Sequence, residues 1–235
     1  MRSPHTGRQT GLASSKKPRR GELRAPALFA FDRALDVNWV VGADEAGRGC
    51  LAGPLVAAAV AFDQSTLSMD DLRALSDLDD SKKRKGERRT ALFVAVTERA
   101  AAIAVAIRPA AVIDRDGLHK TNIAALADAT AQIGRADGIH LTDGFEVGLP
   151  WGKSEKLIKG DSTSAAIAAA SIIAKEVRDT YMVRMADVYP GYGFEGHVGY
   201  ASAGHREAIE ALGPCPLHRM SFNSSAYGSS QSTLD

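Results

Sequence analysis

The stretch VVGADEAGRGCLAGPLVAAAVAF, at residues 40–62, decides the fold. It begins with two valines, reaches the adjacent carboxylates Asp44 and Glu45, turns through Gly-Arg-Gly at 47–49, and continues as an apolar run from Leu55. Apolar runs bounded by glycines are typical of buried strands. We therefore predict a strand hairpin, with two acids near the end of its first strand.

The two adjacent acids favour a cation between them, because carboxylates placed side by side repel each other. Their hard oxygen atoms suit Mg²⁺ or Mn²⁺. Gly47 and Gly49 have no side chain, so a ligand can approach the backbone N–H groups at these positions. For Asp44 and Glu45 alone, a solvated strand end is an equally good interpretation, and the glycines favour a ligand site.

Length and composition indicate one globular domain with tails. The chain has 235 residues, 45% of them hydrophobic and 24% charged, which is enough for one full core. Residues 1–26 are rich in Gly, Ser, Pro, Lys and Arg, and we predict a disordered basic extension. It is either a solvated tail or a source of nonspecific affinity for phosphates. We assign residues 27–222 to the folded domain and 223–235 to a flexible tail.

Several classes of protein are excluded by what the sequence lacks. No apolar run approaches the ~20 residues that span a bilayer, and no signal peptide is present, so we expect a cytoplasmic protein without a membrane partner. Cys50 and Cys215 are then expected to be free thiols. No Cys and His spacing fits zinc, and no phosphate-binding glycine motif indicates a nucleotide cofactor.

The remaining chain predicts alternating strands and helices. We predict helices at 27–35, 85–102, 122–133, 164–185 and 202–212, strands at 102–107 and 138–142, a turn at Val112-Ile113, and a glycine-rich loop at 190–199. The helix at 164–185 is the strongest, with one face formed by Ile167, Ala170, Ser171, Ala174, Val177 and Tyr181. A hairpin combined with strands that precede helices predicts an α/β fold, in which helices pack on a mixed sheet.

Four carboxylates lie where the chain turns after an apolar run: Asp44, Glu45, Asp143 and Asp161. Acids at strand ends are what a two-metal phosphodiester site requires, since ions roughly 3.5–4 Å apart hold the attacking and leaving oxygens. Each acid also has a structural alternative. Asp143-Gly144 is a common turn, and Asp161 is one candidate cap for the following helix, with Ser162 and Ser164 as competitors.

Eight short motifs, taken together in chain order, resemble one family. They are DEAGRG at 44–49, GPLVAAAV at 53–60, DSK at 80–82, TDG at 142–144, KGD at 159–161, AAASIIAKEVRD at 168–179, HVGY at 197–200 and HRMSF at 218–222. In this order they resemble the bacterial type 2 ribonuclease H (ribonuclease HII) family. The resemblance extends over nearly the whole predicted domain.

The resemblance implies a ribonuclease H-like catalytic domain, with a five-stranded mixed sheet flanked by helices and a C-terminal helical segment. It implies an endonuclease that cuts the RNA strand of RNA–DNA hybrids and nicks on the 5′ side of single ribonucleotides embedded in duplex DNA, in DNA repair and replication. Hydrolysis would use two divalent ions, Mn²⁺ or Mg²⁺, and would leave 3′-hydroxyl and 5′-phosphate ends.

The resemblance also implies roles for individual residues. The catalytic metal ligands would be Asp44, Glu45, Asp143 and Asp161. The substrate-binding residues would be Gly47, Arg48, Gly49, Lys82, Ser171, Lys175 and Tyr200. The Gly-Arg-Gly turn would read the ribose 2′-hydroxyl through its backbone, and Tyr200 would stack beside the sugar at the RNA–DNA junction. Lys82 and Lys175 would lie near phosphates or support the site, and Ser171 lies one helical turn before Lys175.

Three positions depart from the usual pattern of the family. Val198 stands where a lysine is frequent before Gly-Tyr, which removes one expected phosphate contact. Thr163 also stands where many members have lysine. Thr142 replaces a valine and places a polar side chain in a strand that should be buried.

Other residues keep structural interpretations. Tyr200 could equally be a core aromatic. His197, His205 and His218 are expected to be structural rather than catalytic. Arg206 and Arg219 are expected either to contact phosphates or to form surface salt bridges.

Two other classes of function compete with the nuclease: a noncatalytic binder of hybrid or junction nucleic acid, and a metal-dependent phosphatase. The presence of all four acids argues against the binder, and the ordered motifs argue against the phosphatase. We expect a monomer. The end of the tail, at 231–235, weakly resembles a sliding-clamp peptide without its terminal aromatic residue.

Overall fold

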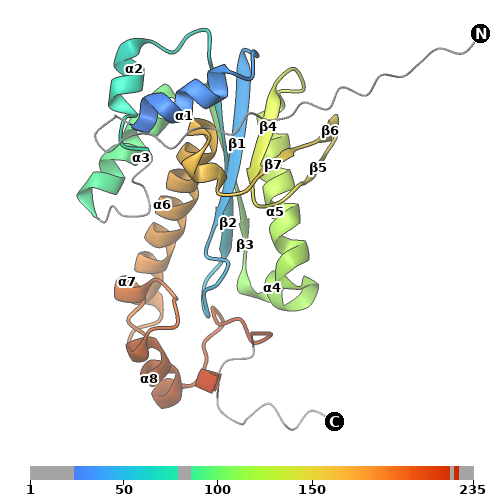
Figure 1. The fold of residues 1–235 in the computed structure, drawn as a ribbon. Coiled ribbons are helices and arrows are strands. Elements are labelled where there is room, and N and C mark those ends of the chain that lie inside the picture. Colours follow the sequence, from blue (N-terminus) through green and yellow to red (C-terminus); the bar gives the residue numbers. More distant parts are fainter. Residues whose placement is uncertain (1–23, 79–85, 223–224, 228–235) are drawn as a thin grey trace, which may run out of the picture.

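A five-stranded mixed sheet forms the centre of the computed structural model, which describes residues 24–78, 86–222 and 225–227. Its strands lie in the order β3 (Ala102–Arg108), β2 (Leu55–Asp63), β1 (Trp39–Ala46), β4 (Ile139–Asp143) and β7 (Glu155–Leu157). Strand β2 is antiparallel to both β3 and β1, whereas β4 is parallel to both β1 and β7. The predicted hairpin and mixed sheet are confirmed (Figure 1).

Strand β2 shows why the apolar run after the glycines is continuous. Its alternate residues face opposite sides of the sheet. One set packs in the core that includes α6 (Ala165–Val188): Val56, Ala58, Val60 and Phe62. The other set packs in the core that includes α5 (Leu118–Ile133): Leu55, Ala57, Ala59 and Ala61. All eight residues are fully buried, so neither face of this strand needs polar residues.

Helices cover both faces of the sheet (Figure 1). On one face lie α1 (Arg24–Arg33), α2 (Met69–Ala74), α3 (Glu87–Arg99) and α6, and on the other lie α4 (Ala110–Asp116) and α5. The C-terminal part contains α7 (Phe194–His197), α8 (Ala203–Leu212) and the 3₁₀ helix η3 (Ser225–Tyr227). Smaller elements are β5 (Gly148–Leu149), β6 (Gly152–Lys153) and the 3₁₀ helix η2 (Gly160–Ser162).

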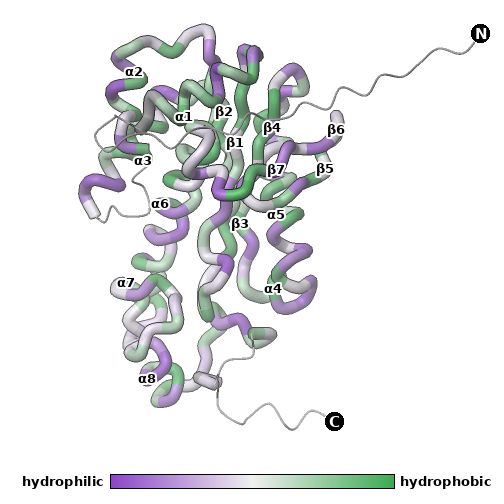
Figure 2. Tube along the Cα trace, in the orientation of Figure 1, coloured by the Kyte–Doolittle hydropathy of each residue, from purple (hydrophilic) through white to green (hydrophobic). Residues whose placement is uncertain are grey.

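The hydropathy of the chain follows this layered arrangement. Figure 2 shows mostly hydrophobic central strands, while the helices alternate between hydrophobic and hydrophilic residues. Within the described ranges, no helix combines the length and the apolar character needed to cross a lipid bilayer.

The first turn of α6 packs directly on β1. A Cβ atom on Gly42 would lie 2.2 Å from backbone atoms of Ala166 and Ile167, so only glycine allows this approach. Asp32 of α1 accepts a hydrogen bond from the Ala166 N–H (3.0 Å) and is fully buried. Burial raises the pKa of Asp32 to about 7, against the lowering effect of hydrogen bonds from the start of α6. The close approach at Gly42 therefore fixes α6 against β1, the strand that carries the two adjacent acids, and Asp32 holds the start of α6 from the side of α1.

Some predicted boundaries were wrong. Val112 and Ile113, predicted as a turn, lie inside α4, because Pro109 not only ends β3 but also occupies the N-cap of that helix. The fixed φ of proline suits both positions. The predicted glycine-rich loop at 190–199 contains α7, and α1 begins at Arg24 rather than Ala27.

Candidate active site

The four predicted acids come together at the ends of two parallel strands. The pairing of β1 with β4 places Ala43 opposite Thr142, so Asp44 and Asp143 follow on neighbouring strands. The Gly160 N–H donates a 2.7 Å hydrogen bond to Asp143 Oδ1, which brings η2 and therefore Asp161 to the same strand end. Glu45 follows Asp44 on β1, and its N–H donates to Asp44 Oδ1 at 2.8 Å.

Burial and repulsion from neighbouring carboxylates make Asp44 and Glu45 difficult to ionise. Burial, together with the charges of Asp143 and Asp161, raises the pKa of Asp44 to about 6, although a hydrogen bond from Ser171 opposes this rise. Burial and the charge of Asp44 raise the pKa of Glu45 to about 7. The charge of Arg48 and the amide of the buried Asn122 lower the pKa of Glu45 only in part. The residues nearby therefore leave much of the negative charge uncompensated.

The chemistry of the site fits a divalent cation, although the side chains do not yet converge on one. Glu45 Oε2 is buried and makes no hydrogen bond within the described part of the chain. All four groups offer hard carboxylate oxygens, which suit Mg²⁺ or Mn²⁺. Among the residues that the structure describes, no three His, Cys, Asp or Glu side chains lie close enough to enclose an ion.

Asp161 does not cap the following helix. Ser164 takes that position, and its hydroxyl accepts a hydrogen bond from the Ile167 N–H at 3.4 Å. Asp161 lies instead within η2 and is 4% exposed. Ser164 is therefore the N-cap residue of α6, and the Asp161 carboxylate lies with the acid cluster.

The Gly-Arg-Gly turn lies beside the acids and is packed from behind. Gly47 has a φ of 86°, and a Cβ there would lie 1.9 Å from Arg178 Nε. By contrast, a Cβ on Gly49 would meet no atom within 4 Å. The Arg48 guanidinium lies 4.6 Å from the ring centroid of Phe145, just after β4. The turn thus has one tightly packed glycine and one open glycine.

Tyr200 is a surface aromatic rather than a core residue, because 43% of it is exposed. Lys175 Nζ lies 5.0 Å from the Tyr200 ring centroid and 2.9 Å from Asp179 Oδ1. The Leu51 N–H donates to the Gly199 carbonyl (2.9 Å), which ties the loop of Tyr200 to the segment after the Gly-Arg-Gly turn. The predicted Lys82 lies outside the described residues.

Two arginines are fully buried, each with 0% exposure: Arg178, which sequence reasoning missed, and Arg219. Arg178 donates to three carbonyl oxygens, those of Ala52, Pro54 and Val198, at 2.8–3.0 Å. Arg219 donates to the carbonyls of Arg48 and Gly53 at 2.9–3.0 Å. Both guanidinium groups therefore hold the loop at 47–54 from its buried side.

The prediction that Arg219 contacts phosphates or forms a surface salt bridge was wrong, because its partners are backbone carbonyls of the interior. Burial lowers the pKa of Arg219 to about 10. A signal for Arg178 was present in the sequence. It lies four residues after Ala174 and seven after Ser171, on the helix face that includes the predicted site residue Ser171.

One departure from the family pattern, Thr142, has a local explanation. The hydroxyl of the fully buried Thr142 bonds to Ser154 Oγ (2.9 Å) and to the Phe145 carbonyl, so its polarity is satisfied. Val198 has a φ of 44°, which is unusual for a β-branched residue, and its carbonyl accepts the bond from Arg178.

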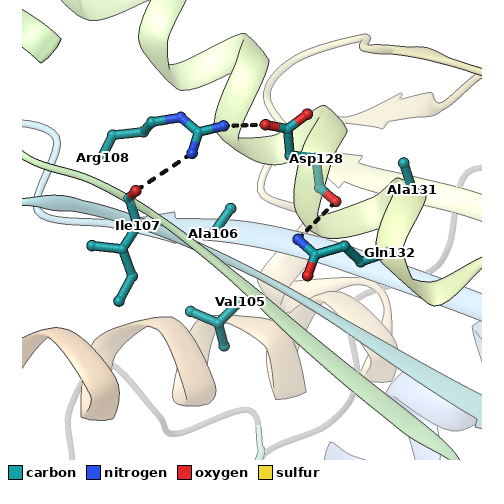
Figure 3. Close-up of a pocket in the computed structure, with 7 residues that line it drawn as sticks. All are labelled: Val105, Ala106, Ile107, Arg108, Asp128, Ala131 and Gln132. Carbon is teal, nitrogen blue, oxygen red and sulfur yellow. Dashed lines mark hydrogen bonds and ion pairs between the residues drawn. The ribbon is translucent and has the colours of Figure 1, made fainter.

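A shallow groove between β3 and α5 lies apart from these residues. Figure 3 shows its lining, in which Arg108 pairs with Asp128 and Gln132 donates to the Asp128 carbonyl (3.1 Å). No predicted site residue lines this groove, so it is not part of the candidate site.

Comparison with known proteins supports the same interpretation. The sequence model of the family described as Ribonuclease HII matches residues 41–225. Ribonuclease HII of Rhodococcus opacus (strain B4) is 47% identical over 217 residues, which cover 91% of this chain and 93% of that protein.

Two solved structures share the fold. The structure of the PCNA:RNase HII complex from Archaeoglobus fulgidus matches with a TM-score of 0.64 and 25% identity, over 77% of this chain and 93% of that chain. Bst-RNase HIII in complex with Mn²⁺ matches with a TM-score of 0.58 and 22% identity, over 91% and 75% respectively. The family match and the relative with 47% identity decide the assignment. This chain belongs to the ribonuclease HII family, and it is a type 2 ribonuclease H endonuclease.

Proposed function

We propose that this ribonuclease H nicks duplex DNA on the 5′ side of single embedded ribonucleotides, in addition to cutting RNA–DNA hybrids, through two divalent metal ions. The observation that carries the proposal is the register of β1 and β4, which sets Asp44 beside Asp143 next to a glycine turn. Glu45 and Asp161 complete a buried group of acids that repel one another.

The four carboxylates would hold the metal, Mg²⁺ or Mn²⁺. When bound, such ions activate a water molecule and stabilise the leaving oxygen of the phosphodiester. The presence of Mn²⁺ in the related Bst-RNase HIII complex supports this assignment. The hydroxyl of Ser171 would keep Asp44 oriented, since it lies near enough to that carboxylate to lower its pKa.

The Gly-Arg-Gly turn would recognise the ribose. A 2′-hydroxyl both donates and accepts hydrogen bonds, and it is the group that distinguishes RNA from DNA. Gly49 leaves open space above its backbone, and Arg178 and Arg219 hold the carbonyls of the following loop inward. The outer side of the turn is thus left for substrate.

Tyr200 would stack on the neighbouring deoxyribose and exclude a hydroxyl there, which selects the RNA–DNA junction. Its exposed ring and the cation of Lys175 beside it support a joint sugar and phosphate contact.

The proposal is tested by incubation with duplex DNA that contains one ribonucleotide, with and without Mn²⁺. Metal-dependent nicking on the 5′ side supports it. Binding without a nick would favour the noncatalytic alternative, and release of inorganic phosphate from a monoester would favour the phosphatase.

Replacement of Tyr200 by alanine should lower kcat/KM on a single embedded ribonucleotide by roughly 10–100-fold, because base and sugar stacking on an aromatic ring is lost. Folding and metal binding should be unchanged, since the ring is exposed. Tyr200→Phe, the matched control, should retain most activity if stacking matters. Equal activity of Tyr200→Ala and the wild type on both substrates would assign junction selection to other residues.

The metal-free protein should lose stability as the pH rises. The folded-state pKa values of Asp44 and Glu45 lie above their ordinary values, so from about pH 4 to about pH 7 the folded state binds more protons. The free energy of unfolding should therefore fall over this range, by at most roughly 1.4 kcal/mol per pKa unit for each group. Melting temperatures in EDTA and in Mn²⁺ measure this, and stabilisation by Mn²⁺ should grow with pH.

Asp32→Asn provides the control for this experiment. Asp32 also has a raised pKa but belongs to the contact between α1 and α6. Its replacement should flatten the pH dependence in EDTA without changing the increment caused by Mn²⁺. A stabilisation by Mn²⁺ that is the same at all pH values would contradict carboxylate ligation.

The sliding-clamp contact stays a prediction. The structure of the archaeal complex with PCNA supports it, while the residues 231–235 that would make the contact lie outside the described part of this chain. The same holds for Lys82 as a phosphate contact and for the basic extension at 1–26.

A further inference from the structure

We propose that His205 and His218 are positioning residues, which hold the backbone of Tyr200 in place through a directional chain of hydrogen bonds. This inference rests on the proposed function, because it concerns how the junction-selecting ring is held. The three histidines of this region, His197, His205 and His218, contact no described acid of the cluster, and their rings pack on one another and on Phe194.

The direction of the chain follows from a backbone donor. The Cys215 N–H lies 2.9 Å from His218 Nδ1, and an amide N–H can only donate, so Nδ1 of a neutral His218 accepts. The Cys215 carbonyl oxygen also lies 3.1 Å from Nδ1, but it already accepts the shorter bond from the His218 backbone N–H (2.9 Å). The proton of His218 is then on Nε2, which lies 3.2 Å from His205 Nε2. That atom must accept, so His205 carries its proton on Nδ1, which lies 2.8 Å from the Tyr200 carbonyl.

The neighbouring backbone is held in the same way. The Tyr200 N–H donates to the His197 carbonyl (2.9 Å), and the Gly199 N–H donates to His197 Nδ1 (3.1 Å). His197 Nε2 is then the donor to the Tyr192 carbonyl, at 2.8 Å. The rings of His197 and His205 stack at 4.2 Å. Because the Tyr200 ring itself is 43% exposed, its position over Lys175 depends on these backbone anchors.

Burial keeps the chain neutral. His205 is 0% and His218 2% exposed, and burial lowers the pKa of both, to about 4 for His205. The titratable groups that face them are His197, Tyr192, Tyr227 and Cys215, together with one another. A proton added to His205 Nε2 would face the Nε2–H of His218 and break the hydrogen bond between the two rings. The direction of donation in the chain therefore stays the same throughout the neutral pH range.

Amide substitutions test the chain, because asparagine can place its amide group near Nδ1 and glutamine near Nε2 of a histidine. His205→Asn should keep the donor to the Tyr200 carbonyl and stay within about 3-fold of the wild type, whereas His205→Gln should lose it. The readout is kcat/KM on a single embedded ribonucleotide divided by kcat/KM on a continuous hybrid. Loss of one buried hydrogen bond should lower this ratio by about 10-fold in His205→Gln.

At His218, glutamine rather than asparagine should be the better replacement. There His218→Gln keeps the donor to His205, and His218→Asn breaks it. If the histidines acted by packing alone, the same amide residue should be tolerated better at both positions. The inference is therefore overturned if asparagine is the better replacement at both His205 and His218, or if glutamine is.

A double substitution separates this inference from the proposed function. If His205 acts through Tyr200, His205→Gln should lower the ratio no further when combined with Tyr200→Ala. If Tyr200→Ala alone has no effect, the proposed role of Tyr200 fails. If Tyr200→Ala impairs nicking and His205→Gln adds an independent loss, the positioning role fails.

The wild-type protein provides a test that needs no variant to fold. Imidazole ¹⁵N NMR should show His205 as the Nδ1–H tautomer and His218 as the Nε2–H tautomer at neutral pH. The opposite tautomer at either residue would break the chain and overturn the inference.

Discussion

Replacement of Asp44 by asparagine is expected to reduce cleavage by at least 100–1,000-fold, roughly the loss caused by removal of one electrostatic group at a reacting centre. The fold should persist, since the asparagine oxygen can still accept the bond from the Glu45 N–H. Without metal, the melting temperature should stay equal or rise, because a buried carboxylate with a raised pKa is removed. Mn²⁺ should stabilise the variant less than the wild type, because ligand stabilisation follows affinity.

The matched control is Asp32→Asn, which makes the same change at an equally buried acid outside the site. Cleavage by this control should equal that of the wild type. Asp44→Asn protein that cleaves normally would remove Asp44 from the catalytic group, whatever its effect on stability.

The second large effect is expected from Gly47→Ala. The new Cβ would need a left-handed backbone, at roughly 1–2 kcal/mol, and would lie 1.9 Å from Arg178 Nε. Displacement of Arg178 would weaken three hydrogen bonds to loop carbonyls, at about 1 kcal/mol each. We expect a loss of about 4 kcal/mol and a melting temperature lower by roughly 10 °C, together with loss of cleavage.

Gly49→Ala is the control at the other end of the same turn. Its Cβ would meet no atom within 4 Å, so the melting temperature should change little. Cleavage should nevertheless fall by roughly 10–100-fold if the ribose approaches this backbone, because small misplacements of the substrate are costly. Normal cleavage by Gly49→Ala would contradict direct reading at Gly49, while the result at Gly47 would still report on packing.

The hairpin and the acids could be predicted because their signals are local. The run from Leu55 to Phe62 is apolar throughout, and this pattern alone specifies a strand buried on both faces. Asp143 is the last residue of the short strand β4 and stands before a glycine, so its place at a strand end could also be predicted. That Asp44 lies beside Asp143 depends on the parallel register, which no short segment encodes.

Features that depend on distant partners could not be predicted in the same way. A charged residue in sequence is assigned to the surface by default, but Arg219 is buried because carbonyls of Arg48 and Gly53 surround it. The tautomer of His205 depends on Cys215 through His218. Pro109 follows a strand and also begins a helix, which is why the turn predicted at Val112-Ile113 was wrong.

The parallel pairing of β1 with β4 also determines when the acid cluster forms during folding. The β1–β2 hairpin closes a short loop, whereas β4 lies far along the chain and must close a much longer one. Asp143 and Asp161 therefore join Asp44 and Glu45 late, after most of the sheet has assembled. We expect bound metal to slow unfolding while leaving the folding rate almost unchanged, which stopped-flow experiments with Mn²⁺ and with EDTA would measure. On this view the polypeptide reaches its native topology first and acquires its ions afterwards.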